Sequence, residues 1–129
     1  MTETNPQNTA SSPLGWHNDG TTTYTVTHGN NGIAQANYAG DTAYLNDYRP
    51  SGGATNDYLF GLNLANNNPQ TYSNASVTQL LYTANLYHDL LYQLGFTSAA
   101  GNFQTSANGA GGKGGDEVIL NSQEYTAFL

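Results

Sequence analysis

The strongest pattern along the chain is a stripe of apolar positions at helical spacing. Counted from its first member, the stripe falls at +3, +4, +7, +11 and +14, which is one face of an α-helix. Its members are Val77, Leu80, Leu81, Ala84, His88 and Leu91. Ser73 or Asn74 can cap the start, and Gly95 stands where a left-handed residue commonly ends a helix. The pattern therefore predicts a helix over about 74–94.

The opposite side of this helix is also partly apolar. Leu86 and Leu90 project away from the main stripe, with Tyr82 beside them. A narrow polar sector remains for solvent, formed by Thr78, Asn85, Asp89 and Gln93. A helix that is apolar around most of its circumference is normally covered on more than one side. The rest of the chain offers little cover, so we expect a missing partner: more chain, or self-association through Leu86 and Leu90.

Strand patterns are shorter. Residues 21–27 (TTTYTVT) are rich in β-branched side chains, and residues 58–64 (YLFGLNL) place apolar residues on one face at period two. Residues 116–120 (DEVIL) predict another strand, and residues 33–48 a strand followed by a loop. Residues 1–12 are polar without periodicity and are expected to form a disordered lead-in.

Charge then narrows the possible partners. Two Lys and Arg stand against nine Asp and Glu, which gives a formal net charge of −7. Such a chain cannot neutralise several phosphates at once, so we expect no nucleic-acid partner and no binding to anionic membranes. The sequence has no Cys, no apolar run near the roughly 20 residues of a membrane span, and no signal-peptide pattern at its start. Many Gly and Tyr beside few charges are typical of a folded, loop-rich, secreted module.

Three histidines are candidates for chemistry. His17, His28 and His88 do not have the spacing of metal ligands, and the sequence contains no H-E-x-x-H. His88 lies in the apolar stripe and precedes Asp89, so it could act as an acid or a base. The interpretation we favour is a core histidine that hydrogen-bonds to backbone or to a Tyr hydroxyl.

Other motifs have ordinary structural interpretations. Residues 111–119 (GGKGGDEVI) match a single copy of a calcium-binding nonapeptide, which needs a stacked neighbour to complete its ion site. Asp41, Asp47 and Asp57 fit no EF-hand spacing and are expected to be solvated. Asn74-Ala75-Ser76 is an N-glycosylation sequon that could equally serve as a helix cap.

A set of short motifs occurs in a fixed order over about residues 8–124. They are SPLGWH (12–17), THGNN (27–31), FGLNL (60–64), LYHD with YQLGF (86–96), GNFQ (101–104) and GAGGKGGD (109–116). Together they resemble the mature part of fungalysin-type zinc metallopeptidases, which are secreted fungal relatives of thermolysin.

The resemblance implies an α+β fold in which loop-rich antiparallel strands pack on one long helix, as in the N-terminal half of a thermolysin-like peptidase. Residues 13–129 would then be part of a metallopeptidase domain. The zinc ligands and general base of the family lie on an H-E-x-x-H motif and a later Glu, which this sequence lacks. We therefore assign no catalytic, cofactor-binding or metal-binding residue to the chain.

The first functional hypothesis is thus a truncated zinc metalloendopeptidase that is inactive alone. Zinc, a protein or peptide substrate and extracellular proteolysis are expected for the complete, secreted protein. A second hypothesis is a stand-alone secreted binding module with the same fold and no catalysis, which pairs with a peptidase or stacks its Tyr residues and Trp16 on carbohydrate. A third is an enzyme that uses His88 and Asp89.

Overall fold

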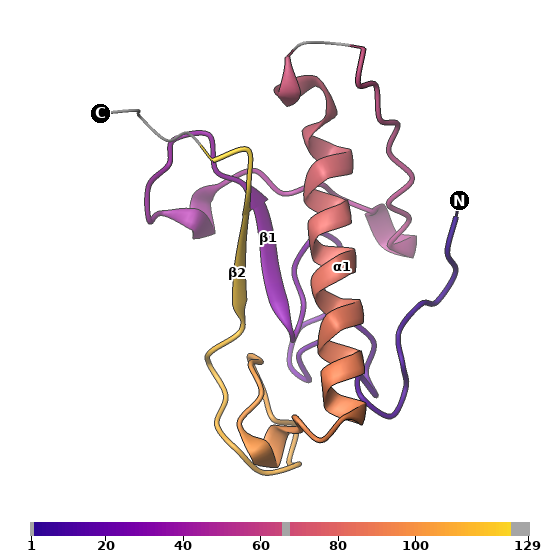
Figure 1. Ribbon diagram of the computed structural model, residues 1–129, viewed down its shortest axis with the longest axis vertical. Coiled ribbons are helices and arrows are strands. Elements are labelled where there is room, and N and C mark those ends of the chain that lie inside the picture. The colour runs from indigo at the N-terminus through magenta and orange to yellow at the C-terminus, as the bar shows by residue number, and fades with distance from the viewer. Residues whose placement is uncertain (1, 66–67, 125–129) are drawn as a thin grey trace.

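The computed structural model describes residues 2–65 and 68–124 (Figure 1). In this part of the chain a long helix, α1 (Ser73–Gln93), runs beside a sheet formed by β1 (Gly32–Ala36) and β2 (Val118–Ser122). Short 3-10 turns interrupt the connecting loops at Tyr44–Asn46, Gly53–Thr55, Pro69–Tyr72 and Ser98–Ala100. The fold is therefore of the α+β class that the sequence predicts.

The two strands pair in parallel, so the expectation of antiparallel strands is wrong. Gly32 lies opposite Val118, and Ala36 lies opposite Ser122. Parallel pairing needs a long crossover between the strands, usually one that contains a helix. Residues 37–117 form that crossover and include α1. Antiparallel pairing occurs among the described residues as isolated bridges, such as His28 with Ile33 and Ala36 with Tyr48, and the predicted strands at 21–27 and 58–64 do not extend it.

The segments 21–27 and 58–64 are extended loops instead of strands. In the first, only isolated bridges join Asn18 to Thr23 and Val26 to Ser51 within the described residues. In the second, Leu62 and Leu64 are exposed instead of facing a core. A strand needs a neighbouring edge to satisfy its backbone hydrogen bonds. The apolar alternation of 58–64 finds no such edge in the described part of the chain.

The buried face of α1 is a row of residues four positions apart. Its members are Ser73, Val77, Leu81, Asn85 and Asp89. Val77 and Leu81 pack on Ala34 and Ala36 of β1 and form the small apolar core. Asn85 and Asp89 continue the same row as buried polar residues, although the sequence predicts them on the solvent side. The prediction fails because it assumes that a helix buries its apolar side, whereas here polar groups from elsewhere in the chain cover these two residues.

Both ends of α1 have defined geometry. At the C-terminal end Gly95 has a φ of 107°, and the N–H groups of Gly95 and Phe96 bond to the carbonyls of Tyr92 and Leu91. This is the Schellman arrangement that the predicted role of Gly95 requires. At the start, neither Ser73 nor Asn74 caps the helix, because a 3-10 turn precedes it and the helix begins without a side-chain cap. Within the described residues, no helix is both long and apolar enough to cross a membrane.

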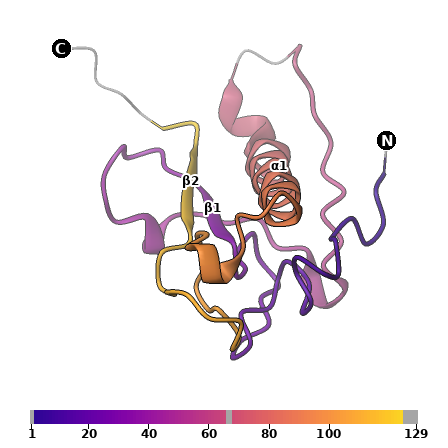
Figure 2. The ribbon, with the colours of Figure 1, turned by 60° about the horizontal axis from the view of Figure 1, so that its bottom comes forward.

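The remaining chain lies on two sides of the helix (Figure 2). The sheet lies along one side of α1, while the N-terminal segment and residues 55–65 lie on the other. Within the N-terminal segment Ser11 and Ser12 are buried, so these two residues pack against the rest of the chain. The division of the chain at residue 12 stays a prediction.

Close approach of two backbone segments gives the first prediction. A Cβ on Gly29 would overlap the carbonyl oxygen of Trp16, so one of the two backbone segments would have to shift. We expect Gly29→Ala to lower the free energy of unfolding by about 1–3 kcal/mol, the usual cost of overpacking. Urea unfolding followed by the fluorescence of Trp16 measures it. Gly61→Ala is the control, because a Cβ there meets nothing within 4 Å; equal stability of the two variants would contradict the prediction.

Candidate functional site

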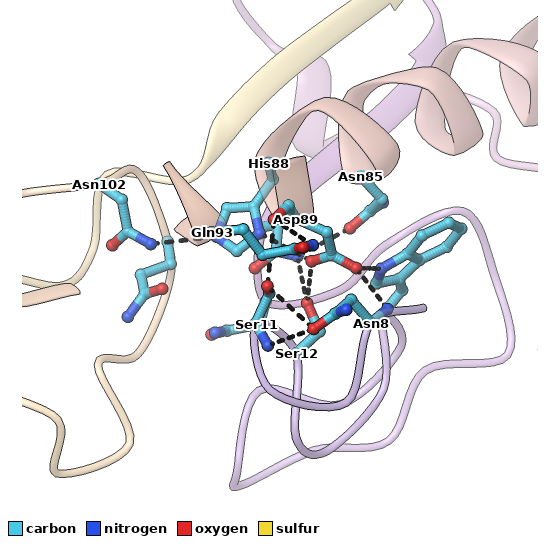
Figure 3. Close-up of polar contacts among 12 residues, drawn as sticks. Asn8, Ser11, Ser12, Asn85, His88, Asp89, Gln93 and Asn102 are labelled. Carbon is cyan, nitrogen blue, oxygen red and sulfur yellow. Dashed lines mark hydrogen bonds and ion pairs between the residues drawn. The ribbon is translucent and has the colours of Figure 1, made fainter. Parts of the chain in front are cut away.

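The carboxylate of Asp89, near the C-terminal end of α1, is buried among polar groups (Figure 3). Its Oδ2 accepts hydrogen bonds from the backbone N–H of Asn8 at 2.8 Å and from Trp16 Nε1 at 2.9 Å. Its Oδ1 accepts one from Ser12 Oγ at 2.6 Å and lies 3.1 Å from His88 Nδ1. The charge is therefore balanced by hydrogen-bond donors, without a Lys or Arg at the carboxylate.

The same N-terminal segment also bonds to the helix backbone and to the next buried polar residue. Ser11 Oγ donates to the carbonyl oxygen of Asp89 at 3.1 Å. Asn31 Nδ2 lies 3.2 Å from Ser12 Oγ and 2.9 Å from Asn85 Oδ1, and so joins the segment to α1. We call the polar side chains of residues 8, 11, 12, 16, 31, 85, 88 and 89, with the backbone N–H of Asn8, the Asp89 network.

The Asp89 network keeps its central carboxylate ionised. Burial raises the pKa of Asp89, but the hydrogen bonds from His88, Ser12, Asn8 and Trp16 outweigh it and hold the pKa below its ordinary value. A carboxylate that accepts several hydrogen bonds is stabilised in its charged form. Asp89 is therefore a fixed negative charge at neutral pH and not a proton donor.

His88 has both ring nitrogens engaged. Asn102 Nδ2 lies 3.1 Å from His88 Nε2, and His88 Nδ1 lies 3.1 Å from Asp89 Oδ1. These two contacts engage both polar atoms of the ring. The His88 side chain is only 10 % exposed. The polar atoms of His88 are therefore all hydrogen-bonded within the fold, and neither ring nitrogen is free for an acid–base step. This argues against the hypothesis of an enzyme that uses His88 and Asp89.

The other two histidines occupy a separate place. His17 Nδ1 lies 3.0 Å from the carbonyl oxygen of His28, and its ring stacks on Tyr58 with centroids 5.1 Å apart. The His28 ring stacks on Tyr24 at 3.8 Å. Burial lowers the pKa of His17, although its bond to the His28 carbonyl acts in the opposite direction. The three histidines do not converge.

The described residues do not fit a zinc site. No group of three or more His, Asp or Glu side chains in 2–65 and 68–124 is placed to hold a metal ion. Both ring nitrogens of His88 are already engaged, Nδ1 with Asp89 and Nε2 with Asn102. No zinc chemistry can therefore be assigned to these residues.

The glycine-rich segment forms structure of its own. Gly115 N–H donates to the carbonyl of Gln104, and Asp116 Oδ1 accepts from the Gln104 N–H at 3.2 Å. Asn30 exchanges two hydrogen bonds with the backbone of Ser106 at 2.8 and 3.0 Å. The Asp of the calcium-like nonapeptide thus holds a neighbouring loop, which agrees with the structural interpretation of that motif.

The short motifs of the sequence therefore meet in pairs. SPLGWH supplies Ser12 and Trp16 to the Asp89 of LYHD, and GNFQ supplies Asn102 to His88. THGNN supplies Asn31 to the same network. These motifs hold one another in place, and the side chains named here are engaged with each other instead of forming an open catalytic group.

The comparisons with known proteins agree with these motifs. Residues 1–128 match the family described as Fungalysin metallopeptidase (M36), and the chain belongs to this family. The extracellular metalloproteinase MEP of Pyricularia oryzae is 56 % identical over 124 residues, which is 96 % of this chain and 19 % of that protein. The proteins of the same name from Fusarium vanettenii and Aspergillus fumigatus are 53 % and 50 % identical over 119 residues each, 92 % of this chain and 18 % and 19 % of theirs.

The chain thus spans about a fifth of the length of the curated relatives that it matches. Sequence reasoning identified the family from its motifs, but it missed that Asn85 and Asp89 are buried. The signal in the sequence was that SPLGWH and LYHD occur together, because Ser12 and Trp16 of the first motif bind Asp89 of the second. The absence of catalytic and metal-binding residues from this chain stays a prediction.

Replacement of the central carboxylate tests the network. Asp89→Asn keeps the shape but places an amide NH₂ among donors, so at least one hydrogen bond to a charged acceptor is lost. We expect the free energy of unfolding to fall by about 1.5–3 kcal/mol or more. Asp57→Asn, at an exposed position, removes the same charge and should change it by less than about 0.5 kcal/mol. Equal effects in urea unfolding would show that Asp89 has no special role.

The same variant predicts a pH dependence. Because the pKa of Asp89 is lowered from 3.8 by folding, the carboxylate stabilises the folded state above that pH, and this contribution disappears as the pH falls through the lower folded-state pKa. The stability difference between the native chain and Asp89→Asn should be complete near about pH 6 and shrink below 3.8. Urea titrations at a series of pH values measure it, and a difference that stays constant down to strong acid would refute it.

Proposed function

We propose that this chain is the supporting N-terminal part of a secreted, fungalysin-type zinc metalloendopeptidase. The observation that carries the proposal is a contrast between the two sides of α1. The buried side is fully engaged with the sheet and the Asp89 network. The outward face, defined as Leu86, Tyr87, Leu90 and Leu94, is apolar and open.

The outward face is poorly explained if nothing else packs on it. Leu86 is 40 % exposed and Leu90 is 51 % exposed, although both lie on a regular helix. Full burial of a leucine side chain is worth about 1.5–3 kcal/mol. This chain spans about a fifth of the length of its relatives. We therefore propose that the residues of the complete protein beyond this fifth cover the outward face.

The catalytic step belongs to that remaining part. A zinc peptidase needs three protein ligands and a carboxylate that activates the bound water. The 129 residues contain no H-E-x-x-H, and the described residues offer no metal-binding group. We therefore propose that the chain alone is inactive, and that zinc, protein substrates and extracellular proteolysis are properties of the complete protein, as the names of its relatives suggest.

A chimaera tests the supporting role. In the full-length Pyricularia oryzae relative, the matching 124 residues are replaced by this chain, and hydrolysis of a protein substrate is measured. We expect the chimaera to retain activity and the double variant Leu86→Asp/Leu90→Asp to lose it at least 10-fold through failure to assemble, on the order of 1.4 kcal/mol or more. Asn46→Asp/Ala54→Asp adds the same charges at exposed loop positions and should keep activity. An active Leu86→Asp/Leu90→Asp enzyme would overturn the proposal.

The isolated chain gives a separate prediction. With the outward face uncovered, we expect concentration-dependent self-association through Leu86 and Leu90, because association buries apolar area. Sedimentation velocity should show larger species that disappear in Leu86→Asp/Leu90→Asp and persist in Asn46→Asp/Ala54→Asp. A stable, strictly monomeric native chain would instead favour the stand-alone binding module.

A further inference from the structure

Asn74 lies outside the Asp89 network and is not explained by the proposed function. It is the Asn of the sequon Asn74-Ala75-Ser76, whose middle residue is not proline. The structure removes the competing explanation of this residue as a helix cap, because α1 begins at Ser73 after a 3-10 turn and has no side-chain cap. We propose that Asn74 carries an N-linked oligosaccharide on its Nδ2 atom.

The side-chain amide of Asn74 is arranged so that this modification costs little. Its Oδ1 accepts a hydrogen bond from the Tyr48 hydroxyl at 2.9 Å. Glycosylation converts the primary amide to a secondary amide, in which the carbonyl oxygen keeps its acceptor role. Nδ2 donates none of the hydrogen bonds found in the described part of the chain, so attachment of a sugar there breaks none of them.

The surroundings of the sequon leave room for a glycan. The hydrogen bond between Tyr48 and Asn74 is exposed, with Tyr48 51 % exposed and Asn74 half-buried. Pro69, Gln70 and Thr71 of the preceding turn are exposed as well. The Ser76 hydroxyl donates to the Tyr72 carbonyl at 3.2 Å.

The proposed glycan is compatible with the proposed outward face. Asn74 precedes Leu86 by twelve residues, which is about 18 Å along the helix axis and about 120° around it. A sugar on Asn74 would therefore project from the opposite end of α1 and leave Leu86 and Leu90 free. The inference rests on the proposed function in one respect only, the passage of the protein through a secretory pathway.

The test uses the 129-residue chain, secreted from yeast behind a cleavable leader. Ala110→Thr completes a second sequon, whose acceptor is Asn108 in an exposed loop, and this sequon reports that a molecule has met the glycosylation machinery. Molecules that carry the Asn108 glycan are isolated, and peptide-N-glycosidase converts each glycosylated Asn to Asp for identification by peptide mass spectrometry. We expect conversion at Asn74 in most of these molecules.

Matched variants separate the sequon from local structure. Ser76→Thr keeps both the sequon and a hydroxyl and should retain the glycan, whereas Ser76→Ala and Asn74→Gln should lose it. Unmodified Asn74 in molecules that carry the Asn108 glycan overturns the proposal. That result would leave the supporting role untouched, because the chimaera experiment tests it through Leu86 and Leu90.

Discussion

One buried carboxylate, that of Asp89, ties the N-terminal segment of this chain to α1. It accepts hydrogen bonds from the N-terminal segment through Asn8 and Ser12, from the indole of Trp16, and from His88 on its own helix. A buried charge without a cationic partner is tolerated only if donors surround it. The position of residues 8–16 against α1 is therefore a requirement of this carboxylate, and the polar end of the helix can be buried only because that segment is there.

The sequence predicted the parts of the fold that depend on local pattern. The helix at Ser73–Gln93 and its ending at Gly95 follow from spacing and backbone freedom, both of which are properties of neighbouring residues. The side of the helix that is buried does not follow, because Asn85 and Asp89 are covered by polar partners up to 81 residues away. The strand predicted at residues 58–64 does not form. Its apolar alternation is that of a strand, but no neighbouring strand among the described residues satisfies its backbone hydrogen bonds.

The sequence predicted the family to which the motif residues belong, but not the structural role of those residues. The order of motifs from SPLGWH to GAGGKGGD identified the fungalysin family, to which the chain belongs. The sequence alone does not show that the motifs contact each other in the folded chain. His88 illustrates this, since its neighbour Asp89 suggested acid–base chemistry until Asn102 was found on its other nitrogen. A motif built of reactive residue types can thus be purely architectural, and only the partners of each atom distinguish the two roles.

The parallel pairing of β1 and β2 also has a consequence for biosynthesis. Gln35 Nε2 meets Asn121 Oδ1 across 86 residues, so β1 leaves the ribosome long before its partner exists. At about 5–20 residues per second, the nascent chain waits about 4–17 s with that edge unpaired. Contacts between residues so distant in sequence also make folding slow. During this interval the edge of β1 stays open to pairing with other chains, and its exposure ends only when β2 has been translated.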